Sequence, residues 1–391
     1  MGRATIVGAG VIAPSGTGRH DSFLSLMAGQ SKVRAIDRFD PSLFNSRVAA
    51  QIYSSPGDPC QVSQLDLALI AAHEAISEAG VSVADFDALV FASAVGESAK
   101  MESCFIRSCA DAPAAFPLDS AGKQLAQALG FQGALYTQTT GCTAGLDAVG
   151  LACDLIETGV ETRILVVASE TPITPVVLAS FDRIGAVARF EGDPTFASRP
   201  FDRDRCGFVL GEGAGALVLE ARCDTRQEER KAVFAVKGWH SVSSGFHMTA
   251  IRQDGSDIAR AIEGALRCAN ITPNQIDLLD LHATSTKQND AAEAAAVRMV
   301  FGARSADLPV VAQKSINGHA LGASNLIELV NALTILERGT VPKATNLFAQ
   351  DAACEVFLPR EQLEREMTTL LKVSSGFSGI HTAMVIEKGS P

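Results

Sequence analysis

The residue whose chemistry stands out first is Cys142, which lies in a run of small residues, Thr-Gly-Cys-Thr-Ala-Gly, at positions 140–145. A β-prone run precedes it, and apolar residues recur at helical spacing from Leu146 to Ile156. This pattern predicts a strand, a tight turn and a helix, with Cys142 at the N-terminus of the helix. Unpaired N–H groups and the helix dipole favour a thiolate there, so we expect a lowered thiol pKa and a nucleophile. The alternative is a buried, inert cysteine, the usual fate of a free thiol.

Three further stretches could supply partners for a nucleophile. His282 stands where a buried strand gives way to a polar loop, Lys314 and His319 follow a second such strand, and Phe377 lies between glycines before the last strand, 383–386. Each histidine taken alone is more often a hydrogen-bonded structural residue than a catalyst. Because α/β folds build sites at the carboxyl ends of strands, these groups at equivalent strand ends predict one shared site.

An internal repeat indicates how the elements that position these residues are organised. Residues 71–93 and 261–283 run parallel at a constant offset of 190 positions, and both predict an amphipathic helix, a polar loop and a buried strand. A looser pair relates the strand and turn before the Cys142 helix to residues 310–329. We therefore predict an α/β protein of two similar halves, 1–230 and 231–391, with the charged run 222–231 as the seam.

Two glycine-rich stretches resemble nucleotide-binding loops only superficially. Residues 5–12 carry a Gly-x-Gly, but Pro14 follows where a helix would have to open. Residues 207–215 lack the Lys-Ser/Thr of a phosphate loop and run into a strand-like segment, 216–220. We expect a strand entering a loop in the first case, and close backbone approach beside the active site in the second.

Composition and charge exclude several classes of function. The chain has 391 residues, of which 47% are apolar and 20% charged, as expected for a soluble protein with a sizeable core. A formal net charge of −11 repels phosphates, so non-specific nucleic-acid binding is not expected. Nine cysteines without paired spacing fit a reducing cytoplasm and give no structural zinc motif. The N-terminus fits neither a signal peptide nor a membrane helix.

Over nearly its whole length the chain resembles the β-ketoacyl-acyl-carrier-protein synthases of the condensing-enzyme, or thiolase-fold, superfamily. Within that group it is most similar to the ketosynthase-α subunits of type II polyketide synthases. The stretches that carry this closer similarity are 140–149, 171–175, 198–202, 246–249 and 286–290. The resemblance implies a thiolase fold, in which two pseudo-symmetric halves form a layered α-β-α-β-α core.

The resemblance also implies the catalytic roles. Cys142 is the implied nucleophile, His282 and His319 are the paired active-site histidines, and Lys314 is a supporting cation with Glu293 in the network near it. A thiolate that accepts an acyl chain and two neutral histidines that stabilise an enolate are the groups this reaction needs. Neither a metal nor a redox cofactor is implied.

Substrate binding is implied in the same way. Thr284 and Thr286 match positions that contact the phosphopantetheine arm of an acyl carrier protein. Phe377 matches the gating phenylalanine, and its N–H is expected to form an oxyanion hole with that of Cys142. Arg189 falls near a carrier-contacting position. We expect an acidic carrier to dock on a basic patch formed by Arg183, Arg189, Arg199, Arg203 and Arg205, although solvated arginines or pairs with Asp182, Asp202 and Asp204 would give the same pattern.

Two departures from the family pattern bear on the gate. The usual Asn-Ala-His-Gly becomes Asp-Leu-His-Ala at 280–283, and Gly-Phe-Gly-Gly becomes Gly-Phe-Ser-Gly at 376–379. Each lost glycine, at Ala283 and at Ser378, adds a Cβ where the backbone of the family needs unusual dihedral angles or room to move.

The implied function is a ketosynthase that joins malonyl carrier to a Cys-bound acyl chain by decarboxylative Claisen condensation in type II polyketide biosynthesis. The alternative is synthase II-type elongation in fatty-acid biosynthesis. A non-enzymatic chain-length factor lacks the nucleophile that Cys142 supplies here, and a degradative thiolase needs a second cysteine that these motifs do not supply. We expect a dimer that pairs through a strand of the N-terminal half, as a heterodimer with a chain-length-factor homologue or alternatively a homodimer.

Overall fold

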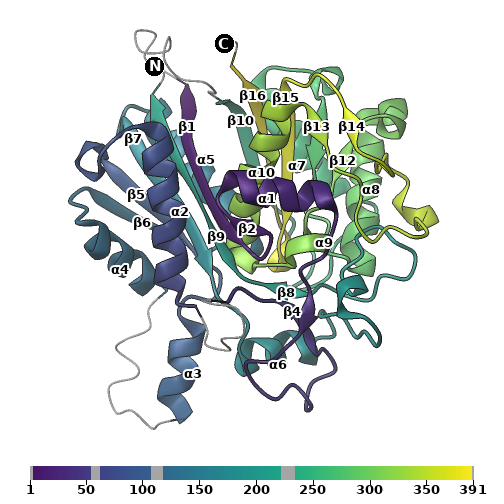
Figure 1. Cartoon of the computed structure of the whole chain (residues 1–391). Helices are drawn as coiled ribbons and strands as arrows, with labels where there is room; N and C mark the ends of the chain where they lie inside the picture. Colours follow the sequence, from purple (N-terminus) through teal and green to yellow (C-terminus); the bar gives the residue numbers. More distant parts are fainter. Residues whose placement is uncertain (1–2, 54–61, 107–117, 222–233, 390–391) are drawn as a thin grey trace.

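A computed structural model of the chain describes residues 3–53, 62–106, 118–221 and 234–389. Its main sheet runs in the order β12-β11-β15-β16-β10-β1-β9-β7-β5-β6 (Figure 1). The first five strands of this order come from the C-terminal part of the chain and the last five from the N-terminal part. The two sets join where β1 pairs antiparallel with β10, with Thr5 opposite Ala235.

The strands of the N-terminal set are β1 (Ala4–Ala13), β5 (Ala88–Ala92), β6 (Ala134–Gln138), β7 (Arg163–Glu170) and β9 (Gly213–Ala221). Those of the C-terminal set are β10 (Phe234–Ser243), β11 (Leu278–Asp280), β12 (Val310–Val311), β15 (Thr369–Ser375) and β16 (Ile380–Lys388). Shorter strands form hairpins and a small side sheet: β2 (Gly16–Thr17), β3 (Arg34–Ala35), β4 (Val48–Ala50), β8 (Leu210–Gly211), β13 (Thr340–Val341) and β14 (Leu363–Glu364).

The helices are α1 (Arg19–Ala28), α2 (Gln64–Ala79), α3 (Ser98–Ile106), α4 (Ser120–Leu129), α5 (Ala144–Glu157), α6 (Pro175–Arg183), α7 (Ser256–Ala269), α8 (Lys287–Phe301), α9 (Lys314–Asn317) and α10 (Ser324–Arg338). Helix α2 packs on β1, β9 and β7, and α7 packs on β10 and β16. Between the two sets of strands lie α5 and α10, each of which contacts both sets. The result is the predicted α-β-α-β-α layering.

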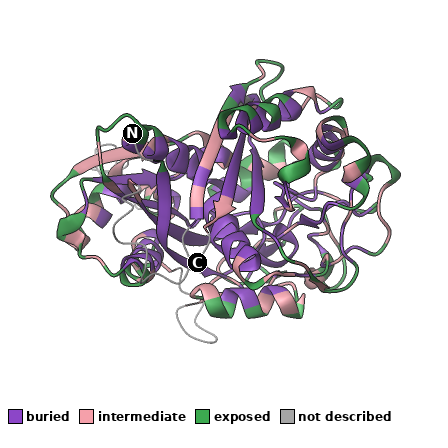
Figure 2. Cartoon of the chain, turned by 90° about the horizontal axis from the view of Figure 1, so that it is seen from above, coloured by how far each residue is buried: buried purple, intermediate pink, exposed green. Residues whose placement is uncertain are grey.

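The central layer is the most buried part of the molecule. Every residue of α10 from Ser324 to Leu336 is buried, and so are most residues of α5. Figure 2 shows the buried core along the central strands and helices, with exposed residues on the outer helices and loops. No helix in the described ranges is both long and apolar enough to span a bilayer.

The internal repeat corresponds to equivalent elements, as predicted. Helix α2 and strand β5 match α7 and β11, and in both copies a 3₁₀ turn with a capping box lies between helix and strand. Asp87 accepts hydrogen bonds from the N–H groups of Thr162 and Arg163, and Asp277 accepts the equivalent bonds from Thr368 and Thr369. The repeated aspartate thus ties each copy to its neighbouring strand. The predicted seam, 222–231, lies outside the described residues.

The glycine-rich stretches are packing sites. A Cβ on Gly10 of β1 would lie 2.1 Å from the carbonyl oxygen of Ala71 in α2, and one on Gly215 of β9 would lie 2.7 Å from the carbonyl carbon of Leu326 in α10. Both positions therefore need glycine so that a helix can approach the strand closely. Residues 5–12 lie in β1, which ends at Ala13 before a turn, as predicted for a strand entering a loop. In the second stretch, 207–215, a Cβ on Gly211 would lie 2.2 Å from the carbonyl oxygen of Asn317, two residues before His319, which agrees with the predicted close backbone approach beside the site.

Candidate active site

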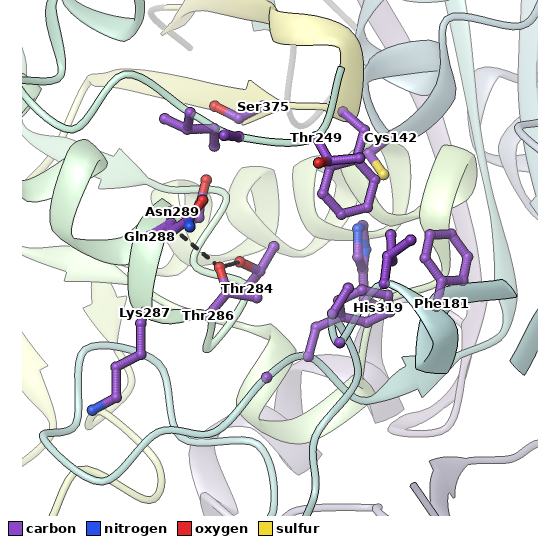
Figure 3. Close-up of a pocket in the computed structure, with 18 of the residues that line it drawn as sticks. Cys142, Phe181, Thr249, Thr284, Thr286, Lys287, Gln288, Asn289, His319 and Ser375 are labelled. Atoms are coloured by element: carbon purple, nitrogen blue, oxygen red, sulfur yellow. Dashed lines mark hydrogen bonds between the residues drawn. The ribbon is translucent and has the colours of Figure 1, made fainter. Parts of the chain in front are cut away.

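A cavity of about 630 Å³ opens at the strand ends, and it brings together six of the predicted site residues. These six are Cys142, His282, Thr284, Thr286, His319 and Phe377. In the view of Figure 3, Cys142 and His319 lie toward one side of the pocket, Lys287 toward the other, and Thr284 and Thr286 between them. Among the described residues, no cluster of His, Cys, Asp or Glu side chains is arranged to hold a metal ion.

Cys142 occupies the predicted turn between strand and helix. Strand β6 ends at Gln138, a 3₁₀ turn spans Gly141–Thr143, and α5 follows from Ala144. The carbonyl oxygen of Cys142 accepts a hydrogen bond from the side chain of Asn325 in α10, and a second, at 3.3 Å, from the hydroxyl of Ser374 in β15. The central helix and the C-terminal strands thus fix the position of the nucleophile candidate.

The thiol of Cys142 does not have the lowered pKa expected from its place before a helix. Burial raises its pKa to about 12, against the lowering effects of Lys314 and of the backbone N–H groups of Phe377 and Cys142. The thiol is therefore protonated at neutral pH. The two N–H groups that lie against the sulfur are the pair expected for an oxyanion hole.

His282 is positioned through its backbone. Its N–H donates to Glu293 Oε1 and that of Ala283 donates to Glu293 Oε2, each at 2.7 Å. Burial raises the pKa of Glu293 to about 7. His282 Nδ1 has no hydrogen-bond partner among the described residues.

His319 is positioned through both its backbone and its ring. Its N–H donates to the carbonyl oxygen of Val209 at 2.7 Å, and its Nδ1 lies 2.8 Å from Ser324 Oγ. Its ring meets that of His282 edge to face, with centroids 5.1 Å apart. Burial, followed by the charge of Lys314, lowers the pKa of both histidines well below the usual value. Both imidazoles are therefore neutral at physiological pH.

The network around Lys314 contains a carboxylate that the sequence did not predict. Lys314 contacts Glu328 of α10 at 2.5 Å, while Glu293 holds the His282 backbone and lies close enough for the charge of Lys314 to lower its pKa against the effect of burial. Lys372 of β15 contacts the other oxygen of Glu328 at 2.6 Å and Asp280 at 3.0 Å. Sequence reasoning missed Glu328 and Lys372 because neither belongs to a recognised motif. The sequence did contain one signal: Glu328 and Lys372 are each the charged residue within a mostly apolar stretch, 326–336 and 370–373.

The substrate-binding candidates line the pocket between its mouth and Cys142. The hydroxyls of Thr284 and Thr286 are 2.9 Å apart, and Thr286 caps α8 by accepting from the N–H of Asn289. Phe377 stacks against Phe181 with centroids 6.1 Å apart. Ala283 adopts φ 46°, so the unusual dihedral angle predicted at this lost glycine is present. The side chain of Ser378 lies outside the described part of the structure.

The basic patch is only partly a surface. Arg183, Arg189 and Arg203 are exposed, and Arg199 stacks on the ring of Phe190. Arg205, however, is 1% exposed and pairs with Asp290 at 3.5 Å and Asp351 at 2.6 Å, so its inclusion was wrong. The error arose because a cluster of arginines in sequence does not show which of them a fold buries.

The fold and this constellation of side chains define a condensing enzyme of the thiolase class. Two family models match: the N-terminal domain of β-ketoacyl synthases over residues 2–224, and the C-terminal domain over 233–348. The chain belongs to the β-ketoacyl synthase family, whose members are acyl-transferring condensing enzymes.

The curated relatives span the whole chain. A polyketide β-ketoacyl synthase 1 of Streptomyces cyaneus is 36% identical over 98% of this chain and 97% of the relative. The tetracenomycin ketoacyl synthase alpha subunit of Streptomyces glaucescens is 35% identical, with coverages of 99% and 97%. A 3-oxoacyl-carrier-protein synthase 2 of Coxiella burnetii is 28% identical, with coverages of 99% and 98%.

Solved structures confirm the thiolase fold. A type II polyketide ketosynthase in complex with its acyl carrier protein and bound to a hexaketide superposes with a TM-score of 0.90, at 31% identity and 99% coverage of both chains. The ishigamide ketosynthase and chain length factor structure gives 0.86, at 29% identity and the same coverage.

Proposed function

We propose that this chain is the ketosynthase subunit of a type II polyketide synthase, and that Cys142 carries the growing acyl chain. The observation that supports this most strongly is the meeting of Cys142, His282 and His319 in one pocket, with two N–H groups against the sulfur. The higher identity to polyketide synthases than to the Coxiella enzyme also favours the polyketide pathway.

The first half-reaction is acyl transfer. The sulfur of Cys142 attacks the thioester carbonyl of an acyl chain on the carrier, and the tetrahedral oxyanion is held by the N–H groups of Cys142 and Phe377. The carbon–sulfur bond to the carrier then breaks, and the carrier thiol leaves with the proton that Cys142 gave up. Because the thiol is protonated at rest, that proton moves through a neutral imidazole of the pocket.

The second half-reaction is decarboxylation and condensation. A malonyl thioester loses CO₂, and its electron pair remains as an enolate whose oxygen accepts hydrogen bonds from His282 and His319. Neutral imidazoles suit this role because each donates one N–H without protonating the carbanion. The carbanion attacks the acyl carbonyl on Cys142, the thiolate leaves and takes up one proton from solvent, and the chain on the carrier is two carbons longer.

The pocket geometry supports delivery by a tethered arm. Thr284 and Thr286 lie between the mouth and Cys142, where their hydroxyls can contact a phosphopantetheine arm of an acyl carrier protein. We assign no resident cofactor, and we place the protein in the cytoplasm and the boundary of its halves at 230/231. The matching strand order of the two halves supports that boundary.

The alternative is elongation in fatty-acid biosynthesis, which the 28% identical Coxiella synthase supports. Mass spectrometry of carrier-bound products distinguishes the two pathways. Unreduced polyketone intermediates support the polyketide pathway, whereas saturated chains formed with fatty-acid reductases support the alternative.

Acyl loading tests the proposed nucleophile, and the pocket supplies a matched control. Cys142 and Cys206 both line the cavity. We therefore compare Cys142→Ala with Cys206→Ala after incubation with carrier protein that bears an acyl thioester. Intact mass measurement should find one acyl adduct on Cys206→Ala and none on Cys142→Ala, which should also fail to elongate. A stoichiometric adduct on Cys142→Ala would overturn the assignment.

A further inference from the structure

Four charged side chains lie together in the interior next to the pocket histidines. Lys314, Lys372, Asp280 and Glu328 have side-chain exposures between 0% and 4%. The two lysines share the two oxygens of Glu328, and Lys372 also contacts Asp280 at 3.0 Å. Two positive and two negative charges balance, as burial requires.

The members of this tetrad lie on elements that lead to a pocket residue or contact one. Asp280 ends β11, two residues before His282, and lies opposite Lys372 of β15 in the parallel register. Strand β15 leads directly to the segment that contains Phe377. Glu328 lies one helical turn after Ser324, which contacts the ring of His319. The tetrad therefore links the segments that carry His282, His319 and Phe377.

Lys372 and Asp280 depend on each other. Asp280 is held by its ion pair with Lys372 at 3.0 Å, and its oxygens have no other hydrogen-bond donor among the described residues. The charge of Lys314 acts on Asp280 as well. Burial raises the pKa of Asp280 to about 6, and the carboxylates Asp280 and Glu328 raise that of Lys372 despite burial. Both groups are therefore charged at neutral pH. Asp280 is also one of the departures from the family sequence.

We propose, resting on the proposed function, that Lys372 is a positioning residue that forms a matched charge pair with Asp280 beside the two histidines. By bridging Asp280 and Glu328, Lys372 leaves one oxygen of Glu328 to Lys314 and ties β11 to β15. Loss of Lys372 alone leaves an unpaired buried carboxylate next to His282, whereas loss of both charges restores neutrality.

The consequence is electrostatic and has a definite sign. The charges that act on both imidazoles are Lys314 and Lys372, and His319 and His381 also act on His282. The other titratable groups around the two histidines are Asp280, Glu328, Glu293 and Cys142. Lys314 and Lys372 lower the pKa of both histidines. A histidine with a lowered pKa stays neutral further into the acid range. Removing the charge of Lys372 raises the histidine pKa, so the neutral, active form is lost at a higher pH.

The experiment measures CO₂ release from malonyl carrier protein from pH 8 down to the lowest pH at which the wild-type enzyme stays folded. Lys372→Met should move the acid limb upward by about one pH unit, and Asp280→Asn/Lys372→Met should return it toward the wild-type position. Lys237→Met is the matched control, because Lys237 of β10 pairs with Glu387 of β16 and both side chains are partly exposed. Titration of ¹³C-labelled histidine by NMR supplies a direct readout of the same shift.

The outcomes separate the pair from a structural role and from the proposed function. An unchanged acid limb and unchanged histidine titration in folded Lys372→Met overturn the inference. If Lys372→Met fails to fold, a folded double variant supports the matched pair and an unfolded double variant overturns it. If the proposed function is wrong, the wild-type protein itself will neither load acyl groups nor release CO₂, so the two failures can be told apart.

Discussion

The pKa of the Cys142 thiol is set by opposing effects, and their balance can be judged only in the folded chain. Its place before α5, Lys314 and two backbone N–H groups all favour the thiolate, but burial outweighs them and keeps the pKa of the thiol at about 12. The thiol is therefore protonated before an acyl substrate arrives, and a thiol is a weaker nucleophile than a thiolate. The neutral histidines nearby are the groups able to accept its proton.

At the residue scale, the two half-reactions should separate in the histidine variants. His282→Ala and His319→Ala should still acquire an acyl group on Cys142, because the oxyanion donors are backbone N–H groups and each single variant keeps one imidazole to accept the thiol proton. CO₂ release should fall by about 10²-fold or more, because enolate stabilisation loses a donor. Intact mass and CO₂ assays on the same preparations measure both steps. Wild-type CO₂ release from both variants would remove the histidines from this role.

Ala283 gives a stability prediction of the same scale. Its φ of 46° costs an L-residue about 1–2 kcal/mol, and glycine at this position would cost about 0.4–1 kcal/mol in unfolded-state entropy. Both Ala283 and the control, Ala261 inside α7, are fully buried, so a change to glycine costs each position about 0.8 kcal/mol for its methyl group. Relief of the strained φ offsets this cost only at position 283, so Ala283→Gly should be destabilised less than Ala261→Gly by about 1–2 kcal/mol. Denaturant unfolding measures both, and equal destabilisation of the two variants would contradict the strain.

At the scale of elements, local patterns predicted more than long-range contacts did. The strand-turn-helix around Cys142 and the helix-loop-strand of the repeat could be predicted because hydrophobic periodicity and turn residues are encoded locally. The convergence of His282 and His319 could be predicted because equivalent strands end at one edge of a sheet. The partner of Lys314 could not, because Glu328 reaches it across a helix packing that no sequence spacing specifies.

The loop that carries Arg189 is where we expect an acyl carrier protein to dock. Arg189 is exposed in the segment between α6 and β8, and its backbone N–H lies against the sulfur of Cys206, a residue of the pocket wall. An acidic carrier approaching the mouth should meet this charge, so Arg189→Glu should raise KM for carrier substrates about three- to tenfold at low salt. The effect should shrink as ionic strength rises, because such contacts are screened.

A surface arginine elsewhere controls for the change in net charge. Arg267 is exposed in the last turn of α7, on the outer helical layer. Arg267→Glu should leave KM for carrier substrates within about twofold, since surface charges beyond a Debye length are screened. An unchanged KM in Arg189→Glu at low ionic strength would show that the carrier docks elsewhere.

At the scale of the whole molecule, the two edge strands of the main sheet differ in burial. Both residues of β12 are buried, whereas those of β6 are not. Strand β6 ends the sheet on the N-terminal side, and all five of its residues are only half-buried, whereas all five of its neighbour β5 are buried. An edge strand of this kind invites pairing with another chain. A subunit interface at β6 would complete the burial of this strand, which leads directly to the Cys142 turn.

The last prediction follows from that edge. We expect the functional unit to be a dimer in which β6 pairs with the same strand of a second subunit, and we expect that subunit to be a homologue lacking the nucleophile. The ishigamide ketosynthase and chain length factor structure, which this chain matches with a TM-score of 0.86, supports the choice. Residues 96–136, which lead up to β6 and are described except for 107–117, are where we expect the partner to meet the pocket.

Activity measured with and without the partner decides the matter. The chain purified alone should be folded, whether light scattering finds a monomer or a dimer. It should nevertheless be poorly active in elongation, because part of its pocket wall is missing. Co-expression with the partner should restore elongation and fix the product length, whereas co-expression with Cys142→Ala in place of the wild-type chain should not. That inactive pair shows that the partner contributes no nucleophile of its own. Full, length-controlled elongation by the single purified chain would instead establish a homodimer that closes its own pocket.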